Sequence, residues 1–213
     1  MDGLQSPRVF SPRFILAGMV LLALFFGGLA MWAQRMAAPP LPVFSSLPRF
    51  TLTASTGQPF SSDDLKGQPY IVDFIFSRCA GPCPLMSAKL SKLQVATADT
   101  PQVKLVSISV DPLADTPEVL AEYAAQYKAD PARWFFLTGA VEPIYTLVEQ
   151  GFKLPVEKSL DPAKAAPGDL IIHSTRFVLV DGQGQIRGYY DSEAPSFEVT
   201  LLKDLRTLLK DVN

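Results

Sequence analysis

Hydrophobic and polar positions follow two different periods along the second part of the chain. Short, almost continuous apolar runs predict buried strands. These runs are residues 70–76, 104–110 and 177–180. Elsewhere apolar residues recur every three or four positions, which predicts helices. These stretches are residues 85–96, 117–127, 144–151 and 197–210. A Gly-rich turn at residues 181–185 joins the strand at 177–180 to a last strand at 186–190 and predicts a hairpin. The pattern predicts an α/β sandwich with a mixed central sheet.

A long apolar run precedes this region. Residues 14–33 contain no charged side chain. At about 1.5 Å per residue, a helix of this length spans a hydrocarbon core of roughly 30 Å, so the run predicts one N-terminal transmembrane helix. A cleaved signal peptide is the alternative, because Gly28-Leu29-Ala30 offers a small-residue cleavage pattern.

The charges that flank the apolar run predict its orientation. Arg8 and Arg13 precede the run, and Arg35 follows it. This bias favours a cytoplasmic N-terminus, formed by residues 1–13. A segment so short does not suit an organelle transit peptide. The sequence therefore predicts a bacterial inner-membrane protein whose folded domain lies in the periplasm.

The exported part divides into a tether and one domain. Residues 34–48 include a proline-rich stretch, which predicts an extended, semi-rigid tether over packed structure. Residues 49–213 are numerous enough to build one substantial core. Within that domain, residues 159–169 predict a long loop.

Composition excludes several classes of protein. The 213 residues carry 19 basic and 21 acidic side chains, a net charge of −2, and this balance leaves no basic excess for nucleic acid. Two cysteines are too few for a disulfide-dense scaffold or a four-thiolate zinc site. One bridge, or one site with few ligands, is the most that they allow.

The two cysteines lie where a predicted strand meets a predicted helix. Cys79 and Cys83 follow the run at 70–76, and Pro84 suits the first turn of a helix. At such a turn, free amide donors and the helix dipole lower the pKa of a thiol. An inert disulfide is the alternative, but a bridge that closes so small a loop constrains the unfolded chain little. The spacing favours a redox-active or metal-binding pair.

The chain contains a single histidine, His173. A lone histidine in an apolar stretch is commonly a packed or surface residue rather than a ligand. Two thiolates and one neutral imidazole nevertheless make a three-coordinate site that suits Cu(I), and they hold Cu(II) with added water or oxygen ligation. For such a site, folding has to bring His173 close to Cys79 and Cys83.

Several motifs in a fixed order resemble the SCO/SenC family of copper metallochaperones. They are Phe76-Ser77-Arg78-Cys79 with Cys83-Pro84, Ser109-Val110-Asp111-Pro112 with Asp115-Thr116-Pro117, Trp134 to Gly139, and His173-Ser174 before Phe177 to Asp181 and Gly184. The likeness extends over about residues 50–209. It departs from the family at Ala80, where many members have proline.

The resemblance implies a thioredoxin-like fold, a membrane tether, and copper bound by Cys79, Cys83 and His173. It also implies a metallochaperone rather than an enzyme, which delivers copper to the CuA centre of cytochrome c oxidase subunit II or reduces the cysteines of that subunit. A periplasmic copper donor or thiol reductant would serve such a protein.

Two other functions remain open. Val72-Asp73-Phe74 with Gly81-Pro82-Cys83 resembles the strand and turn of thioredoxins, which suggests a thiol-disulfide oxidoreductase. In an apolar strand, burial would raise the pKa of Asp73 and make it a base for a thiol, unless a polar neighbour satisfies it. A copper or redox sensor is the third function.

Four further side chains favour structural roles. Asp111 is predicted to be a turn residue after a strand, and Asp115 lies beside a predicted helix cap. The alternative is that the two form a carboxylate pair for metal binding or acid–base chemistry. Met86 could offer a thioether to copper, but its helical position favours core packing. Trp134 predicts an apolar anchor.

Overall fold

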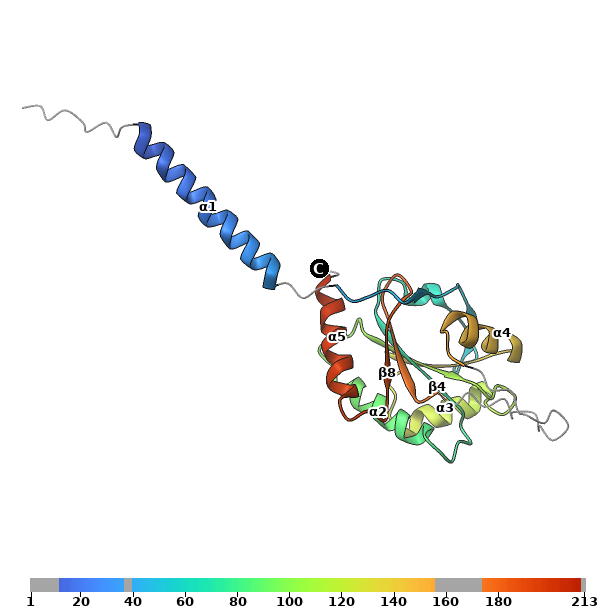
Figure 1. The fold of residues 1–213 in the computed structure, drawn as a ribbon. Helices are drawn as coiled ribbons and strands as arrows, with labels where there is room; N and C mark the ends of the chain where they lie inside the picture. Colours follow the sequence, from blue (N-terminus) through green and yellow to red (C-terminus); the bar gives the residue numbers. More distant parts are fainter. Residues whose placement is uncertain (1–11, 37–39, 156–173, 212–213) are drawn as a thin grey trace, which may run out of the picture. The chain divides into compact units, whose positions relative to one another are not determined.

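The computed structural model describes residues 12–36, 40–155 and 174–211 (Figure 1). The chain divides into two compact units, with the boundary between Pro39 and Pro40. In the first unit, helix α1 (Pro12–Met36) covers the run predicted as a membrane anchor. Measured over the described residues, however, no helix of the protein is long and apolar enough to cross a bilayer. The helix is confirmed, and its membrane-spanning character is not.

The second unit is built on a mixed sheet. Its strands are β1 (Ser45–Ser46), β2 (Thr51–Ala54), β3 (Pro59–Ser61), β4 (Tyr70–Ile75), β5 (Lys104–Ser109), β6 (Trp134–Thr138), β7 (Arg176–Val180) and β8 (Gln185–Asp191). Their spatial order in the described chain is β1-β8-β7-β4-β5-β6-β2-β3. Strands β4, β5 and β6 pair in parallel, and every other neighbouring pair is antiparallel. The mixed central sheet is confirmed.

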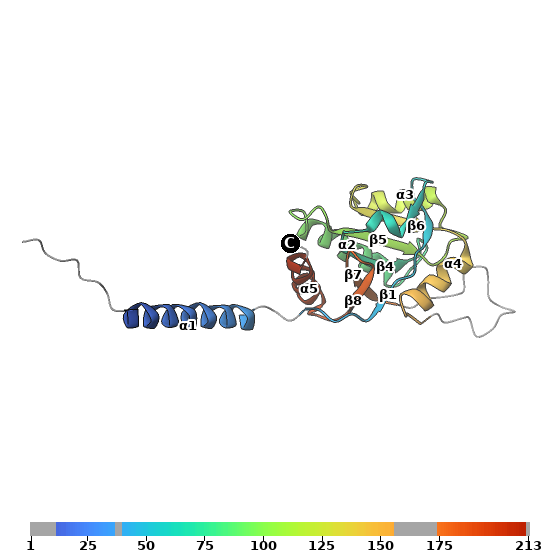
Figure 2. The ribbon, with the colours of Figure 1, turned by 90° about the horizontal axis from the view of Figure 1, so that it is seen from above.

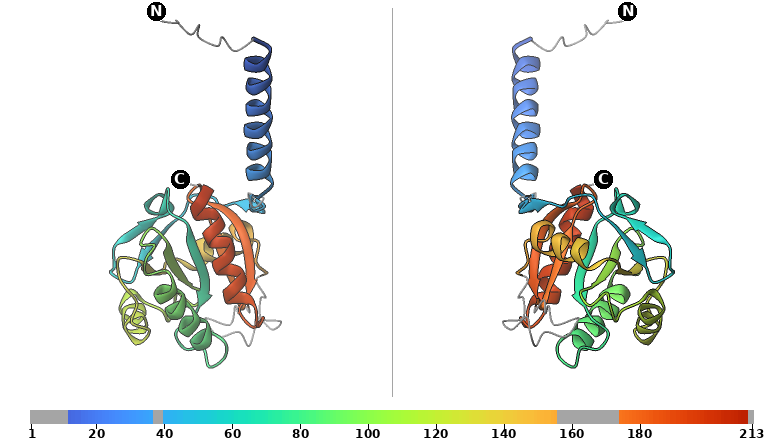
Figure 3. Two further views of the ribbon diagram at one scale, coloured as in Figure 1. Left: turned by 90° about the vertical axis from the view of Figure 1, so that its left-hand side faces the viewer. Right: turned by 90° about the vertical axis from the view of Figure 1, so that its right-hand side faces the viewer.

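Helices cover both faces of this sheet (Figures 2 and 3). They are the short 3₁₀ turn η1 (Ser62–Leu65), α2 (Cys83–Ala96), α3 (Pro117–Gln126), α4 (Val141–Thr146), its π-helical continuation η2 (Leu147–Gly151), and α5 (Phe197–Asp211). Helices α2, α3 and α5 pack on one face, and α4 with η2 packs on the other.

The central strand β4 sends alternate side chains to the two faces. Ile71 and Ile75 pack in the layer of α2, α3 and α5, whereas Val72 and Phe74 pack toward α4 and η2. Because side chains alternate along a strand, Asp73 shares the face of Ile71 and Ile75. A buried carboxyl group therefore lies in the layer that contains both cysteines.

The residues before β2 depart from the predicted tether. They are extended as expected, but they pack on the domain: the Phe44 N–H donates to the Ile186 carbonyl at 2.9 Å, and β1 pairs with β8. The Arg187 guanidinium donates to the carbonyls of Leu41 and Pro42 and pairs with Asp181 at 2.7 Å. The folded unit thus begins at Pro40, and residues 40–48 belong to it.

Candidate metal and redox site

Both cysteines lie at the turn between β4 and α2, as predicted. Strand β4 ends at Ile75, Cys79 lies in the connecting loop, and Cys83 is the first residue of α2. Pro82 precedes the helix with αR backbone angles. Both thiols are free, and the residues are 9% and 4% exposed, respectively. The loop therefore holds two free thiols just below the protein surface.

The environment of Cys83 opposes ionisation. Burial raises the pKa of the Cys83 thiol, and a hydrogen bond with the Cys79 thiol raises it further, whereas a backbone hydrogen bond from Phe76 lowers it. The Gly81 N–H donates to the Cys79 sulfur at 3.4 Å. The expected lowering of the pKa is wrong for Cys83, because desolvation outweighs the effect of the helix N-terminus. Its buried environment therefore favours the neutral thiol of Cys83 over the thiolate.

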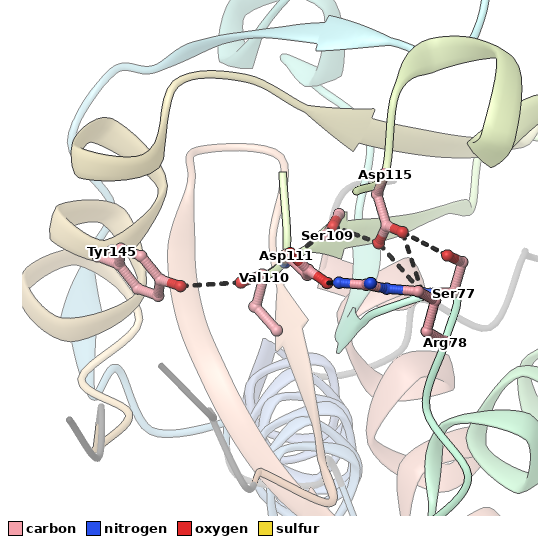
Figure 4. A network of polar contacts seen from close by, with 7 residues as sticks. All are labelled: Ser77, Arg78, Ser109, Val110, Asp111, Asp115 and Tyr145. Carbon is pink, nitrogen blue, oxygen red and sulfur yellow. Dashed lines mark hydrogen bonds and ion pairs between the residues drawn. The ribbon is translucent and has the colours of Figure 1, made fainter. Parts of the chain in front are cut away.

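A network of polar contacts holds the residues just before Cys79 (Figure 4). The Ser77 N–H and hydroxyl both donate to the Asp115 carboxylate, the hydroxyl at 2.5 Å. The Ser109 hydroxyl donates to the same carboxylate at 2.6 Å. Asp115 therefore has a structural role beside the Thr116 cap of α3, as predicted.

Asp111 forms the second half of this network. Its carboxylate accepts a hydrogen bond from the exposed Arg78 guanidinium at 2.6 Å, and its N–H donates to the Ser109 hydroxyl. Its other oxygen, Oδ1, is buried without a hydrogen-bond partner within the described chain. Tyr145 from α4 donates to the Val110 carbonyl at 3.0 Å (Figure 4). Asp111 thus ties the residue next to Cys79 to the end of β5.

Asp73 is fully buried and only partly satisfied. The Ser107 hydroxyl donates to its Oδ1 at 2.6 Å, and the Trp134 indole N–H donates to Ser107 at 2.9 Å. Its Oδ2 has no partner among the residues described. Burial raises the pKa of Asp73 from its ordinary value of 3.8 to about 7. Both predictions for Asp73 are therefore confirmed in part. A polar neighbour, Ser107, satisfies one of its oxygens, and burial still raises its pKa to about 7.

The structure describes two of the remaining predicted site residues, Met86 and Trp134, but not His173. Met86 is buried in the core beside Leu90, and Trp134 is buried as an apolar anchor, so both structural predictions are confirmed. His173 and the predicted loop at 159–169 lie outside the described residues. Within the described part, no group of three His, Cys, Asp or Glu side chains is arranged to hold a metal ion. The third copper ligand stays a prediction.

Comparison with known proteins places this geometry in a family. The sequence profile of the SCO1/SenC family matches residues 43–210. The chain belongs to the SCO1/SenC family. The SCO1 protein homolog of Bacillus subtilis is 34% identical over 144 residues, which cover 67% of this chain and 72% of the relative. The resemblance carried by the sequence motifs is confirmed.

Solved structures of SCO proteins share the fold. A SCO1/SenC family lipoprotein from Bacillus anthracis is 33% identical, with a TM-score of 0.68 over 78% of this chain and 95% of its own. BsSco, a member of the Sco family of cytochrome c oxidase assembly proteins, is 28% identical, with a TM-score of 0.65 over 79% and 98%. Copper-bound ScoI of Arabidopsis thaliana is 23% identical, with a TM-score of 0.63 over 76% and 99%. The domain therefore has the thioredoxin-like α/β fold of these proteins.

Three residues of the site were missed by reasoning from the sequence. Ser77, Arg78 and Ser109 were quoted only as parts of family motifs, and their contacts depend on the pairing of β4 with β5. The available signal was the parallel order of the two strands, because residues that follow neighbouring parallel strands meet at one edge of the sheet.

Proposed function

We propose that this protein is a copper chaperone that binds copper through Cys79, Cys83 and His173 and delivers it to the CuA centre of cytochrome c oxidase subunit II. The observation that carries the proposal is the pair of free, buried thiols, close enough to share a hydrogen bond, at the turn between β4 and α2. Membership of the SCO1/SenC family supports it. Copper is cargo here rather than a resident cofactor.

The donor set fits a soft, transferable ion. Thiolates prefer Cu(I), and two sulfurs with one imidazole leave the ion with low coordination. Because the pKa of Cys83 is raised, the thiol has to lose its proton when copper binds. Copper binding is therefore coupled to proton release, and an acid environment favours release of the ion.

The surface around the pair suits the approach of an acceptor. Five exposed residues without charge surround the cysteines in sequence: Ala80, Gly81, Pro82, Pro84 and Leu85. A thiol or imidazole of the acceptor would enter the open coordination position as one ligand of the chaperone departs. Transfer then proceeds by ligand exchange without free copper.

The test is a titration of the reduced full-length chain with Cu(I) in the presence of a competing chelator. We expect one copper per chain, and we expect Cys79→Ala, Cys83→Ala and His173→Ala each to weaken binding at least tenfold. Met86→Leu is the matched control, since Met86 offers a nearby sulfur that packs in the core. Full affinity in Cys79→Ala would contradict the proposal.

A thiol-disulfide oxidoreductase is the second candidate. The buried Asp73, whose pKa is raised to about 7, favours it, because its charge acts on Cys83. A reductase needs Cys79 and Cys83 but not His173. If His173→Ala retains full oxidase assembly in cells, copper ligation is dispensable and dithiol chemistry accounts for the function.

We also propose that the domain works in the bacterial periplasm, attached to the inner membrane by residues 14–33. The proposal rests on the apolar run and the flanking arginines. Fusions of the C-terminus to alkaline phosphatase and to β-galactosidase test it. Phosphatase activity is expected, and galactosidase activity alone would contradict the orientation.

A further inference from the structure

The buried Asp115 carboxylate accepts hydrogen bonds from three donors, the N–H and hydroxyl of Ser77 and the hydroxyl of Ser109 (Figure 4). Asp115 is fully buried. Its two oxygens accept the Ser77 N–H at 3.2 and 3.1 Å, Oδ1 accepts the Ser77 hydroxyl at 2.5 Å, and Oδ2 accepts the Ser109 hydroxyl at 2.6 Å. Short hydrogen bonds to an ionised acceptor are about twice as strong as neutral ones. The carboxylate therefore holds Ser77 by its backbone and its side chain together.

The turn that Asp115 holds through Ser77 is linked to both cysteines through the neighbouring residue, Phe76. Ser77 lies two positions before Cys79, and the Cys79 N–H donates to the Phe76 carbonyl at 3.1 Å, which closes the turn. The backbone of Phe76 also forms the hydrogen bond that lowers the pKa of the Cys83 thiol. A displacement of residues 76–77 would therefore move one sulfur and remove a hydrogen bond from the other.

Asp115 is itself fixed to rigid structure. Its N–H donates to the Asp111 carbonyl at 2.9 Å. The next residue, Thr116, caps α3 by accepting the Val119 N–H at 3.4 Å. Cys83, in turn, is held at the start of α2. The two cysteines are thus anchored to two different helices, and Asp115 is the link on the side of Cys79.

We propose that Asp115 is the positioning residue of the dithiol: through Ser77 it holds Cys79 at a separation from Cys83 from which the sulfurs close to a disulfide or bind one metal ion. The inference rests on the proposed function in taking Cys79 and Cys83 as the working pair. A preorganised pair loses less conformational freedom when it reacts, so its effective concentration is high. A carboxylate that only stabilised the fold would favour the dithiol and the disulfide equally.

The test is the equilibrium of the full-length chain with glutathione, without copper, in the variant Asp115→Asn. One glutathione disulfide accepts two electrons and two protons from the protein dithiol, which yields two glutathione thiols and the Cys79–Cys83 disulfide. Asparagine keeps the size of the side chain but loses its charge. We expect the equilibrium constant for disulfide formation to fall about tenfold, which for a two-electron couple is about 30 mV.

Three further variants make the result interpretable. Ser77→Ala removes only the hydroxyl contact, so we expect a smaller fall in the same direction, and it serves if Asp115→Asn does not fold. Ser77→Thr keeps the hydroxyl and should retain the wild-type equilibrium. Asp64→Asn is the matched control, because Asp64 accepts the Ser61 N–H at 2.8 Å in η1, outside the dithiol turn. That variant should leave the equilibrium unchanged.

Unfolding by urea in both redox states separates positioning from stability. A positioning role predicts that Asp115→Asn lowers the free energy of unfolding more in the disulfide form than in the dithiol form. Equal losses in the two forms, or less than a threefold change in the glutathione equilibrium, would overturn the inference. A different result would contradict the proposed copper delivery, namely the absence of copper binding by the wild-type chain.

Discussion

Replacing Asp73 by asparagine should remove a large part of the pH dependence of stability. Asp73 is fully buried, and burial raises its pKa from 3.8 to about 7. The folded state therefore binds the Asp73 proton more tightly than the unfolded state does. The resulting contribution to the free energy of unfolding is fully present below pH 3.8 and is lost as the pH rises through 7. At about 1.4 kcal/mol per pKa unit, the complete effect is about 4 kcal/mol.

The effect is large within an accessible pH range. Between pH 5 and pH 8 the same linkage lowers the free energy of unfolding of the wild-type chain by about 2.6 kcal/mol. In Asp73→Asn this contribution disappears, while the acceptor for the Ser107 hydroxyl remains. At pH 8 the variant should match or exceed the stability of the wild type, because it no longer buries a charge.

The assay is urea unfolding of both proteins at several pH values from 5 to 8 under reducing conditions. All other titrating groups are common to the two chains, so the difference between the two pH profiles reports Asp73 together with the effect of its charge on neighbours such as Cys83. The exposed Asp64→Asn serves as the control and should follow the wild-type profile. Parallel profiles for the wild type and Asp73→Asn would refute the reasoning.

Three further predictions concern the metal site and the scaffold. The apparent Cu(I) affinity should rise at least tenfold per pH unit between pH 6 and 8, since Cys83 releases a proton on binding; a chelator competition that shows no pH dependence would contradict this. Arg187→Ala should lower the free energy of unfolding by about 3–5 kcal/mol in urea, because it leaves the buried Asp181 carboxylate unpaired; a loss below 1 kcal/mol would refute it. Gly182→Ala should lower the melting temperature, since its Cβ would lie 2.7 Å from the Gly67 carbonyl carbon, and an unchanged melting temperature would show that the turn can adjust.

The sequence predicted most of the core because buried strands leave a strong local pattern. Strand β4 was predicted within one residue, since all six of its residues are buried and five are apolar. Strands β2 and β3 were missed because they are short and contain polar residues or proline. The prolines before β2 predicted an extended segment correctly. Its attachment to the domain depends on Arg187, which lies 145 positions from Pro42.

Part of the candidate site follows from local sequence, and the rest depends on contacts between residues that are distant in the chain. The spacing of Cys79 and Cys83 and the strand-to-helix turn follow from local sequence, and the structure confirms them. The raised pKa of Cys83 could not be predicted, because it comes from burial by distant parts of the chain. The contact between Ser77 and Asp115 spans 38 positions and exists only because β4 and β5 are parallel neighbours.

Transfer of copper to its acceptor tests the central claim most directly. Two equivalents of the full-length chain loaded with Cu(I) are mixed with the reduced copper-binding domain of cytochrome c oxidase subunit II. One equivalent of a one-electron oxidant such as ferricyanide then converts the two delivered ions to the mixed-valence CuA centre, whose visible absorption is followed. We predict that the wild-type chain forms the centre in the presence of a chelator that captures free copper, whereas Cys79→Ala, Cys83→Ala and His173→Ala do not. Equal formation of the centre by the wild-type chain and His173→Ala, or none from the copper-loaded wild type, would contradict the account.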